Sequence, residues 1–157
     1  MEGDAVVEKG NCYNKMEENV VIELVKAIKE VHGKQPNMGI ITFYSKQRQN
    51  ISLELQNQKL STSKIVVNTV DGFQGSEKDV ILMSCVRSGA GGIGFLQDKR
   101  RLNVALTRAK KTLIVVGNMS TLKANPMWEN FLAEAEARQV CHRYCDIQTS
   151  LVNKLRL

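Results

Sequence analysis

Apolar positions recur at intervals of three and four residues between Val20 and Val31, which is the spacing of one buried helix face. This pattern predicts a helix from about Lys15 to Val31. Asn14 and Glu17, at its start, have the spacing of an N-terminal capping box. Residues 1–13 show no clear period, and we expect a lead-in loop there without a strand.

Four short apolar runs rich in β-branched residues predict buried strands. The runs are Met38 to Tyr44, Lys64 to Val70, Asp79 to Val86 and Thr112 to Gly117. Three helices are predicted beside them, from Ser45 as the cap to about Lys59, from about Asp98 to Lys110 and from Pro126 to about Arg138. Strands that are apolar on both faces and alternate with helices are typical of a parallel sheet covered on both sides. The predicted fold class is therefore α/β.

The chain has the size and composition of one soluble globular domain. Its 157 residues are 43% hydrophobic and 24% charged. We divide it into a lead-in segment (1–13), one α/β domain (14–140) and a weakly patterned tail (141–157). No run approaches the roughly 20 apolar residues that span a bilayer, and the N-terminus lacks the features of a signal peptide. No membrane partner is expected.

The cysteines and the charge indicate the setting in which the protein works. Four unevenly spaced cysteines are too few for a disulfide framework in a chain of this length, which favours an intracellular location, nuclear or cytoplasmic. The 22 Lys and Arg outnumber the 16 Asp and Glu, and the net charge of +6 favours a polyanionic partner. Cys141, His142 and Cys145 are spaced like metal ligands, but a structural zinc site needs four, so no metal site is predicted.

The loop between the second and third predicted strands carries the strongest candidate chemistry. Its sequence, DGFQGSEK, follows a strand end, so we expect its polar groups at the carboxyl edge of the sheet, where open α/β folds bind ligands. Gly75 allows close approach of a phosphate, Gln74 offers an amide, and the Glu77 carboxylate suits ribose hydroxyls. A polar turn without a ligand is the alternative.

Two further segments place arginines close to predicted strand ends. In KRRLNVALTRAKK, Arg108 lies beside Thr107 and shortly before a strand, where its guanidinium can bind a phosphate through two hydrogen bonds. In GIITFYSKQRQ, Tyr44, Gln47 and Arg48 follow a strand end. Tyrosine can stack on a base there, and arginine can contact a phosphate. A solvated helix face and a solvated helix start are the alternatives.

Taken together, TVDGFQGSEKD, RRLNVALTRAK and GIITFYSKQR resemble motifs V, VI and IV of superfamily-one helicases of the senataxin and nonsense-mediated-decay type. Their order and spacing match that family, and the resemblance covers about residues 11–118. It implies a RecA-like domain, the second of two that hold ATP between them and single-stranded nucleic acid across them. Phe43 and Gly89 depart from the family pattern, in which many relatives have Pro and Asn.

The resemblance also implies roles for individual residues. Arg108 resembles the arginine finger on the γ-phosphate, and Arg48 a second arginine that contacts phosphate. The residues that would contact or respond to the nucleotide are Tyr44, Gln47, Gln74, Gly75 and Glu77. Thr69 resembles a hydroxyl that contacts the nucleic-acid backbone, and Arg87 is a further candidate on that surface.

The sequence contains no G-x-x-x-x-G-K-[ST] phosphate loop and no Asp-Glu pair after an apolar strand. The resemblance implies that both belong to the first RecA-like domain, which would supply the Mg²⁺ ligands, and that the opening strand of this domain precedes Met1. We therefore expect half of an ATP-dependent motor on single-stranded RNA or DNA, inactive by itself. A nucleic-acid-binding or scaffolding module without hydrolysis is the alternative.

Overall fold

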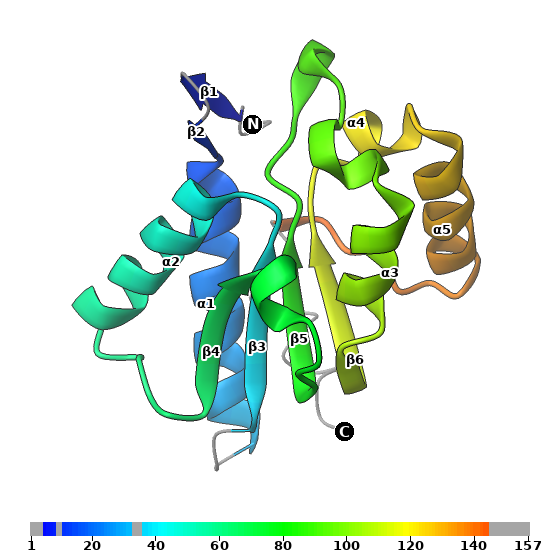
Figure 1. Cartoon of the computed structure of the whole chain (residues 1–157). Coiled ribbons are helices and arrows are strands. Elements are labelled where there is room, and N and C mark those ends of the chain that lie inside the picture. Colours follow the sequence, from blue (N-terminus) through cyan, green and yellow to red (C-terminus); the bar gives the residue numbers. More distant parts are fainter. Residues whose placement is uncertain (1–4, 9–10, 33–35, 145–157) are drawn as a thin grey trace.

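The computed structural model describes residues 5–8, 11–32 and 36–144. Its centre is a parallel sheet of four strands in the order β4-β3-β5-β6 (Figure 1). The strands are β3 (Met38–Thr42), β4 (Ile65–Thr69), β5 (Lys78–Ser84) and β6 (Ala109–Val116). β3 pairs with both β4 and β5, and all five of its residues are buried. The predicted parallel α/β sheet is confirmed.

Helices cover both faces of this sheet. α1 (Lys15–His32) and α2 (Ser45–Asn57) pack on one face, against a core that includes Ile40 and Leu82. α3 (Lys99–Leu106), α4 (Met119–Lys123) and α5 (Pro126–Ala137) pack on the other, with Ile41 and Ile81. Alternate strand residues thus face different cores. No helix in the described part of the chain is long and apolar enough to cross a membrane.

The chain between β4 and β5 crosses the sheet without an α-helix. The short 3₁₀ helix η1 (Asp71–Phe73) follows β4, and the chain then passes over β3 to reach β5. Phe73 is 1% exposed. Its ring lies over Gly39 of β3, because a Cβ added at Gly39 would stand 2.8 Å from Phe73 Cζ. The loop is therefore fixed on the face of the sheet that also carries α3.

The structure differs from the sequence-based elements in several places, and α4 was not predicted. β1 (Val6–Glu8) and β2 (Asn11–Tyr13) form an antiparallel pair outside the parallel sheet, so the prediction of a loop without strands is wrong. Strands of three residues are too short to show an alternating pattern. The helix predicted to reach Lys110 ends at Leu106, and β6 begins at Ala109. The N-cap of α2 is Tyr44, one residue before the predicted Ser45.

Candidate functional site

Arg108 lies in the turn between α3 and β6, beside the loop that leads into β5. Its carbonyl oxygen accepts a hydrogen bond from the Lys78 N–H at 3.0 Å. Its Nε donates to the Val104 carbonyl at 3.1 Å, which fixes the direction of the side chain. Among the described residues, the terminal nitrogens make only long contacts, 3.5 Å to the Ser76 carbonyl and 3.3 Å to Thr107 Oγ1. The N–H groups of these two nitrogens can therefore donate hydrogen bonds to an anion.

Gln74, Gly75 and Glu77 are exposed residues of the adjacent loop. Gly75 has φ +79°, and no atom lies within 4 Å of the place where its Cβ would stand, so its backbone faces open space. Neither Gln74 nor Glu77 forms a side-chain hydrogen bond or ion pair within the described residues. Glu77 directly precedes β5, so it lies at the amino end of that strand. The expected place at the carboxyl edge is wrong for Glu77, because the loop crosses the sheet.

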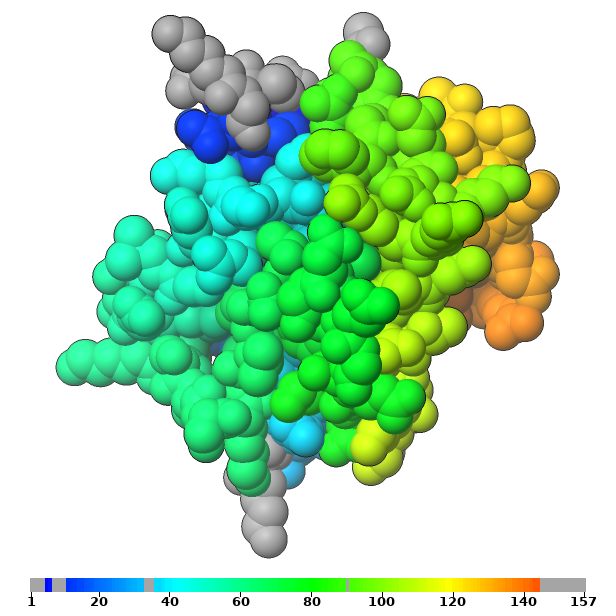
Figure 2. Space-filling view, viewed as in Figure 1, coloured from blue at the N-terminus to red at the C-terminus, as the bar shows by residue number. Residues whose placement is uncertain are grey.

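A second link joins this loop to α3. Arg101 Nη2 lies 3.1 Å from Asp71 Oδ2, and the Arg101 guanidinium also covers the Phe95 ring at 5.2 Å. The Phe95 ring also lies next to the Tyr44 ring, and the centroids of these two rings are 5.6 Å apart. Asp71 and Arg101 thus join two of the segments singled out in the sequence, and Phe95 links Tyr44 of the third segment to Arg101. Figure 2 shows the loop and the segment that includes α3 as neighbours on one face of the molecule.

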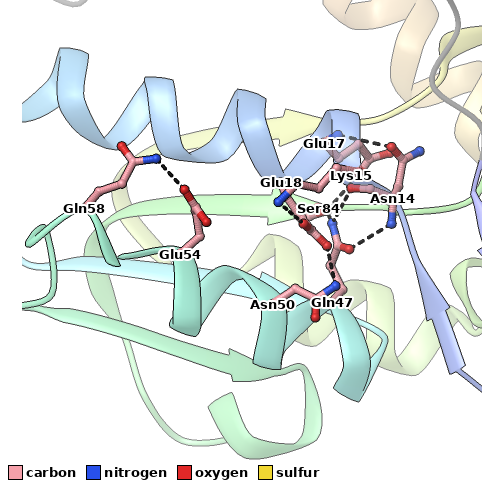
Figure 3. A network of polar contacts seen from close by, with 9 residues as sticks. All are labelled: Asn14, Lys15, Glu17, Glu18, Gln47, Asn50, Glu54, Gln58 and Ser84. Atoms are coloured by element: carbon pink, nitrogen blue, oxygen red, sulfur yellow. Dashed lines mark hydrogen bonds and ion pairs between the residues drawn. The ribbon is translucent and has the colours of Figure 1, made fainter. Parts of the chain in front are cut away.

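Tyr44 and Gln47, both predicted to contact the nucleotide, are buried in this structure. The Tyr44 side chain is 8% exposed, and burial raises the pKa of its hydroxyl. Gln47 is fully buried; its amide nitrogen donates to Ser84 Oγ at 3.0 Å, and its oxygen accepts from the Asn14 N–H at 2.9 Å (Figure 3). Neither side chain is open to a nucleotide in this conformation. The Tyr44 ring packs against Phe95. Gln47 joins Asn14, at the start of α1, to Ser84, at the end of β5.

Three further candidates lie close to the carboxyl edge of the sheet. Arg48 follows β3, Thr69 ends β4, and Arg87 follows β5. Arg48 stands in the first turn of α2, half-buried, and its side chain has no polar partner in the described part of the chain. Thr69 is the last residue of β4 and is also half-buried. Arg87 is already engaged, since its Nε donates to the Gly92 carbonyl at 2.8 Å and its Nη2 to that of Gly91. Arg87 therefore shapes the glycine-rich loop.

The backbones of the two arginines assigned to phosphate are well separated. Arg48 follows the carboxyl end of β3, whereas Arg108 precedes the amino end of β6. The structure brings Arg108 together with the loop of Ser76 and Glu77, and it shows no contact between Arg48 and that group.

Sequence reasoning missed a buried polar network where α1 begins (Figure 3). Asn14 Oδ1 accepts from the Glu17 N–H at 3.1 Å, which confirms the predicted cap. Glu17 Oε2 accepts from Ser84 Oγ at 2.6 Å and from the Val86 N–H at 2.8 Å. Burial raises the pKa of Glu17 to about 7, and these hydrogen bonds oppose that effect. The capping spacing was the only signal in the sequence, and it does not reveal a partner about 70 residues away.

No group of three His, Cys, Asp or Glu that could hold a metal ion occurs among the described residues. Cys141 and His142 are half-buried, and burial raises the pKa of the Cys141 thiol. Cys145 lies outside the described residues, so the predicted lack of a zinc site stays a prediction.

Comparison with known proteins places this geometry in a family. Residues 2–120 match a family described as an AAA domain. The chain is 43% identical to Helicase sen1 of Schizosaccharomyces pombe over 125 residues, 78% of this chain and 7% of that protein. It is 37% identical to the human probable helicase senataxin over 137 residues, 85% of this chain and 5% of that protein.

A second group of relatives carries a different name. The chain is 42% identical to Regulator of nonsense transcripts 1 of Dictyostelium discoideum over 132 residues, 81% of this chain and 10% of that protein. The chain thus spans only a small part of the length of the relatives it matches. Together with the parallel sheet and the motif order, these matches show that the chain belongs to this AAA-domain family, with a RecA-like fold, among superfamily-one helicases of the senataxin and nonsense-transcript-regulator type.

Proposed function

We propose that this chain is the second RecA-like domain of an ATP-dependent helicase. It supplies an arginine finger to an ATP site that a first RecA-like domain completes, and it forms part of a groove for single-stranded RNA or DNA. The observation that carries the proposal is the position of Arg108. Its Nε is fixed by the Val104 carbonyl, while its terminal nitrogens make only long contacts within the described part of the chain, next to the exposed loop of Ser76 and Glu77.

The groups around Arg108 suit a nucleotide. A guanidinium held at Nε presents its remaining N–H donors as a fork, which matches the geometry of phosphate oxygens. The exposed Glu77 carboxylate is an acceptor for ribose hydroxyls. Gly75 lets a ligand approach the backbone closely, since no atom stands near its Cβ position.

Arg108 would act on charge that develops during phosphoryl transfer. A fixed cation costs little reorganisation when negative charge grows on the transferred group, and it therefore stabilises the transition state more than bound ATP. Arg48 would be a second cation at the nucleotide, and because both arginines belong to this domain, a rearrangement within the domain would have to bring Arg48 toward Arg108. The Mg²⁺ ligands and the phosphate loop would come from the first domain.

The nucleic-acid surface would lie at the carboxyl edge, with Thr69 as a contact to the phosphate backbone. Arg101, paired with Asp71, joins this edge to α3, which ends just before Arg108. This contact provides a path by which the nucleotide side and the strand side can influence each other. The names of the relatives, which include the word helicase, support the same assignment.

ATP turnover tests the proposal. The purified 157-residue chain with single-stranded oligonucleotide should show no turnover above background, and turnover should appear when the chain is joined to a first RecA-like domain with a phosphate loop. Arg108→Ala in the joined protein should remove it, while Arg138→Ala, an exposed arginine paired with Glu134 on α5, should not. Turnover by the isolated chain would overturn the proposal. Strand binding without turnover in the joined protein would favour a binding or scaffolding module.

A further inference from the structure

β5 ends in a strained turn centred on Val86. The Arg87 N–H donates to the Cys85 carbonyl at 2.8 Å, which closes a three-residue γ-turn, and Val86 has φ +69°. This φ is unfavourable for a β-branched residue, and γ-turns of this hand are rare. Such a conformation persists only where the surroundings hold it in place.

Two side chains from the start of α1 hold this turn. Glu17 Oε2 accepts a hydrogen bond from the Val86 N–H at 2.8 Å, and Asn14 Nδ2 donates to the Val86 carbonyl at 3.1 Å. The N–H of the strained residue is therefore bound by Glu17 of α1, and its carbonyl by Asn14, which directly precedes α1. Glu17 is itself anchored by Ser84 Oγ at 2.6 Å.

The turn sets the direction in which the chain leaves the sheet. The next residue is Arg87, whose guanidinium binds the Gly91 and Gly92 carbonyls and folds the glycine-rich loop (88–94) around itself. The Gly89 N–H donates to Thr121 Oγ1 at 2.9 Å, which ties the loop to α4. Because Arg87 directly follows Val86, a change in the turn would move Arg87 and the loop together.

We propose that Glu17 and Asn14 are positioning residues for single-strand binding, which act by holding Val86 in its turn and thereby Arg87 and the glycine-rich loop in place. This inference rests on the proposed function, which puts the nucleic-acid surface at the carboxyl edge of the sheet, where the glycine-rich loop follows β5. Neither side chain touches the strand. Their effect passes through the backbone of Val86.

The alternative is that Glu17 only fills space and stabilises the fold. Two substitutions separate these roles. Glu17→Met keeps the length of the side chain but removes the acceptor, whereas Glu17→Gln keeps an oxygen that can accept from Val86 and Ser84. If Glu17 only fills space, Glu17→Met should bind single strands like wild type. If Glu17 is a positioning residue, only Glu17→Gln should do so. At Asn14, Ser keeps the helix cap and is too short to reach the Val86 carbonyl.

The affinity of the protein for a fluorescent single-stranded oligonucleotide, measured at low salt, tests the proposal. Glu17→Met should weaken binding by about tenfold, because the acceptor that holds the Val86 N–H is lost. Asn14→Ser should weaken it by a smaller factor, and Glu17→Gln should stay close to wild type. Glu17→Met combined with Arg87→Ala should bind no more weakly than Arg87→Ala alone, because both act through the same loop.

Relief of strain provides the second arm of the test. Glycine adopts a positive φ without support, so Val86→Gly should recover much of the binding lost in Glu17→Met. Unchanged binding by Glu17→Met, additive losses with Arg87→Ala, or no recovery with Val86→Gly would each overturn the proposal. If Glu17→Met does not fold, the Asn14→Ser variant decides the question in the same way.

Hydrogen exchange separates failure of this inference from failure of the proposed function. In wild type the Gly89 amide should be protected by Thr121, and in Glu17→Met it should exchange at least about tenfold faster. If wild type binds no single strand yet Gly89 loses protection in Glu17→Met, the proposed function fails and the positioning of the loop stands. If strand binding is present and Gly89 exchange is unaffected, Glu17 is not a positioning residue.

Discussion

Asp71 and Arg101 form an ion pair at 3.1 Å that joins the loop after β4 to the helix that ends just before Arg108. The pair connects Thr69, on the proposed strand side, with the proposed nucleotide side. The Arg101 and Asp71 side chains are 36% and 67% exposed, so solvent screens the pair and its effect on stability is small. We therefore expect its importance to lie in coupling.

We predict that Asp71→Asn changes the free energy of unfolding by less than about 1 kcal/mol. In a helicase that contains this domain, the same change should reduce the stimulation of ATP turnover by single strands more than it reduces unstimulated turnover. Arg101→Ala should have the same effect, with no additional loss in the double variant. Equal loss of both activities, or additive losses, would show that the pair does not couple the two sides.

The contact between Phe73 and Gly39 leads to a stability prediction. Ala in place of an interior strand glycine normally stabilises a protein by about 0.5–1 kcal/mol. Here the new Cβ would stand 2.7 Å from Ile81 Cδ1 and 2.8 Å from Phe73 Cζ, so Gly39→Ala should instead destabilise the domain by about 1–3 kcal/mol in urea unfolding. Phe73→Leu should relieve part of the cost, so the double variant should be more stable than the sum of the single changes. Strict additivity would contradict the contact.

The buried carboxyl group of Glu17 predicts a dependence of stability on pH. Its pKa is raised from 4.5 to about 7, so the folded state binds a proton that the unfolded state releases. The contribution of Glu17 is therefore complete below pH 4.5 and is lost as the pH rises through 7. Relative to Glu17→Gln, wild type should lose about 1.4 kcal/mol per pH unit across this window, and about 3 kcal/mol in total. Parallel curves for the two proteins in urea unfolding would rule this out.

Single-strand binding by the isolated chain should be weak, insensitive to sequence and steeply dependent on salt. A partial groove that contacts about three phosphates gives a slope near −2 in log K against log salt. Thr69→Val should weaken binding, whereas Thr112→Val, the same substitution in the first half of β6, should have little effect. Tight, salt-resistant binding would favour a sequence-specific binding module over a motor domain.

Much of the fold could be predicted because β3 and β5 are apolar on both faces and α1 has a clear helical period. The crossover between β4 and β5 could not, because its position depends on long-range contacts, such as that of Phe73 with Gly39 and that of Asp71 with Arg101. The sequence predicted a functional role for Gln47 from its polar side chain. It did not predict that the amide forms buried hydrogen bonds with Asn14 and Ser84. Local sequence shows which groups are polar, whereas their partners depend on tertiary structure.

Arg108→Ala, measured in the helicase that contains this domain, tests the central claim most directly. We predict that kcat for ATP hydrolysis falls by about 10³ or more, while the fold and the affinity for single strands stay near wild type, because a finger acts on charge in the transition state. Arg108→Lys should not restore activity, since an ammonium cannot reproduce a planar fork, and Arg138→Ala should behave as wild type. Near-normal turnover by Arg108→Ala with an unfolded or aggregated domain would show that Arg108 is a structural residue, and would contradict the assignment.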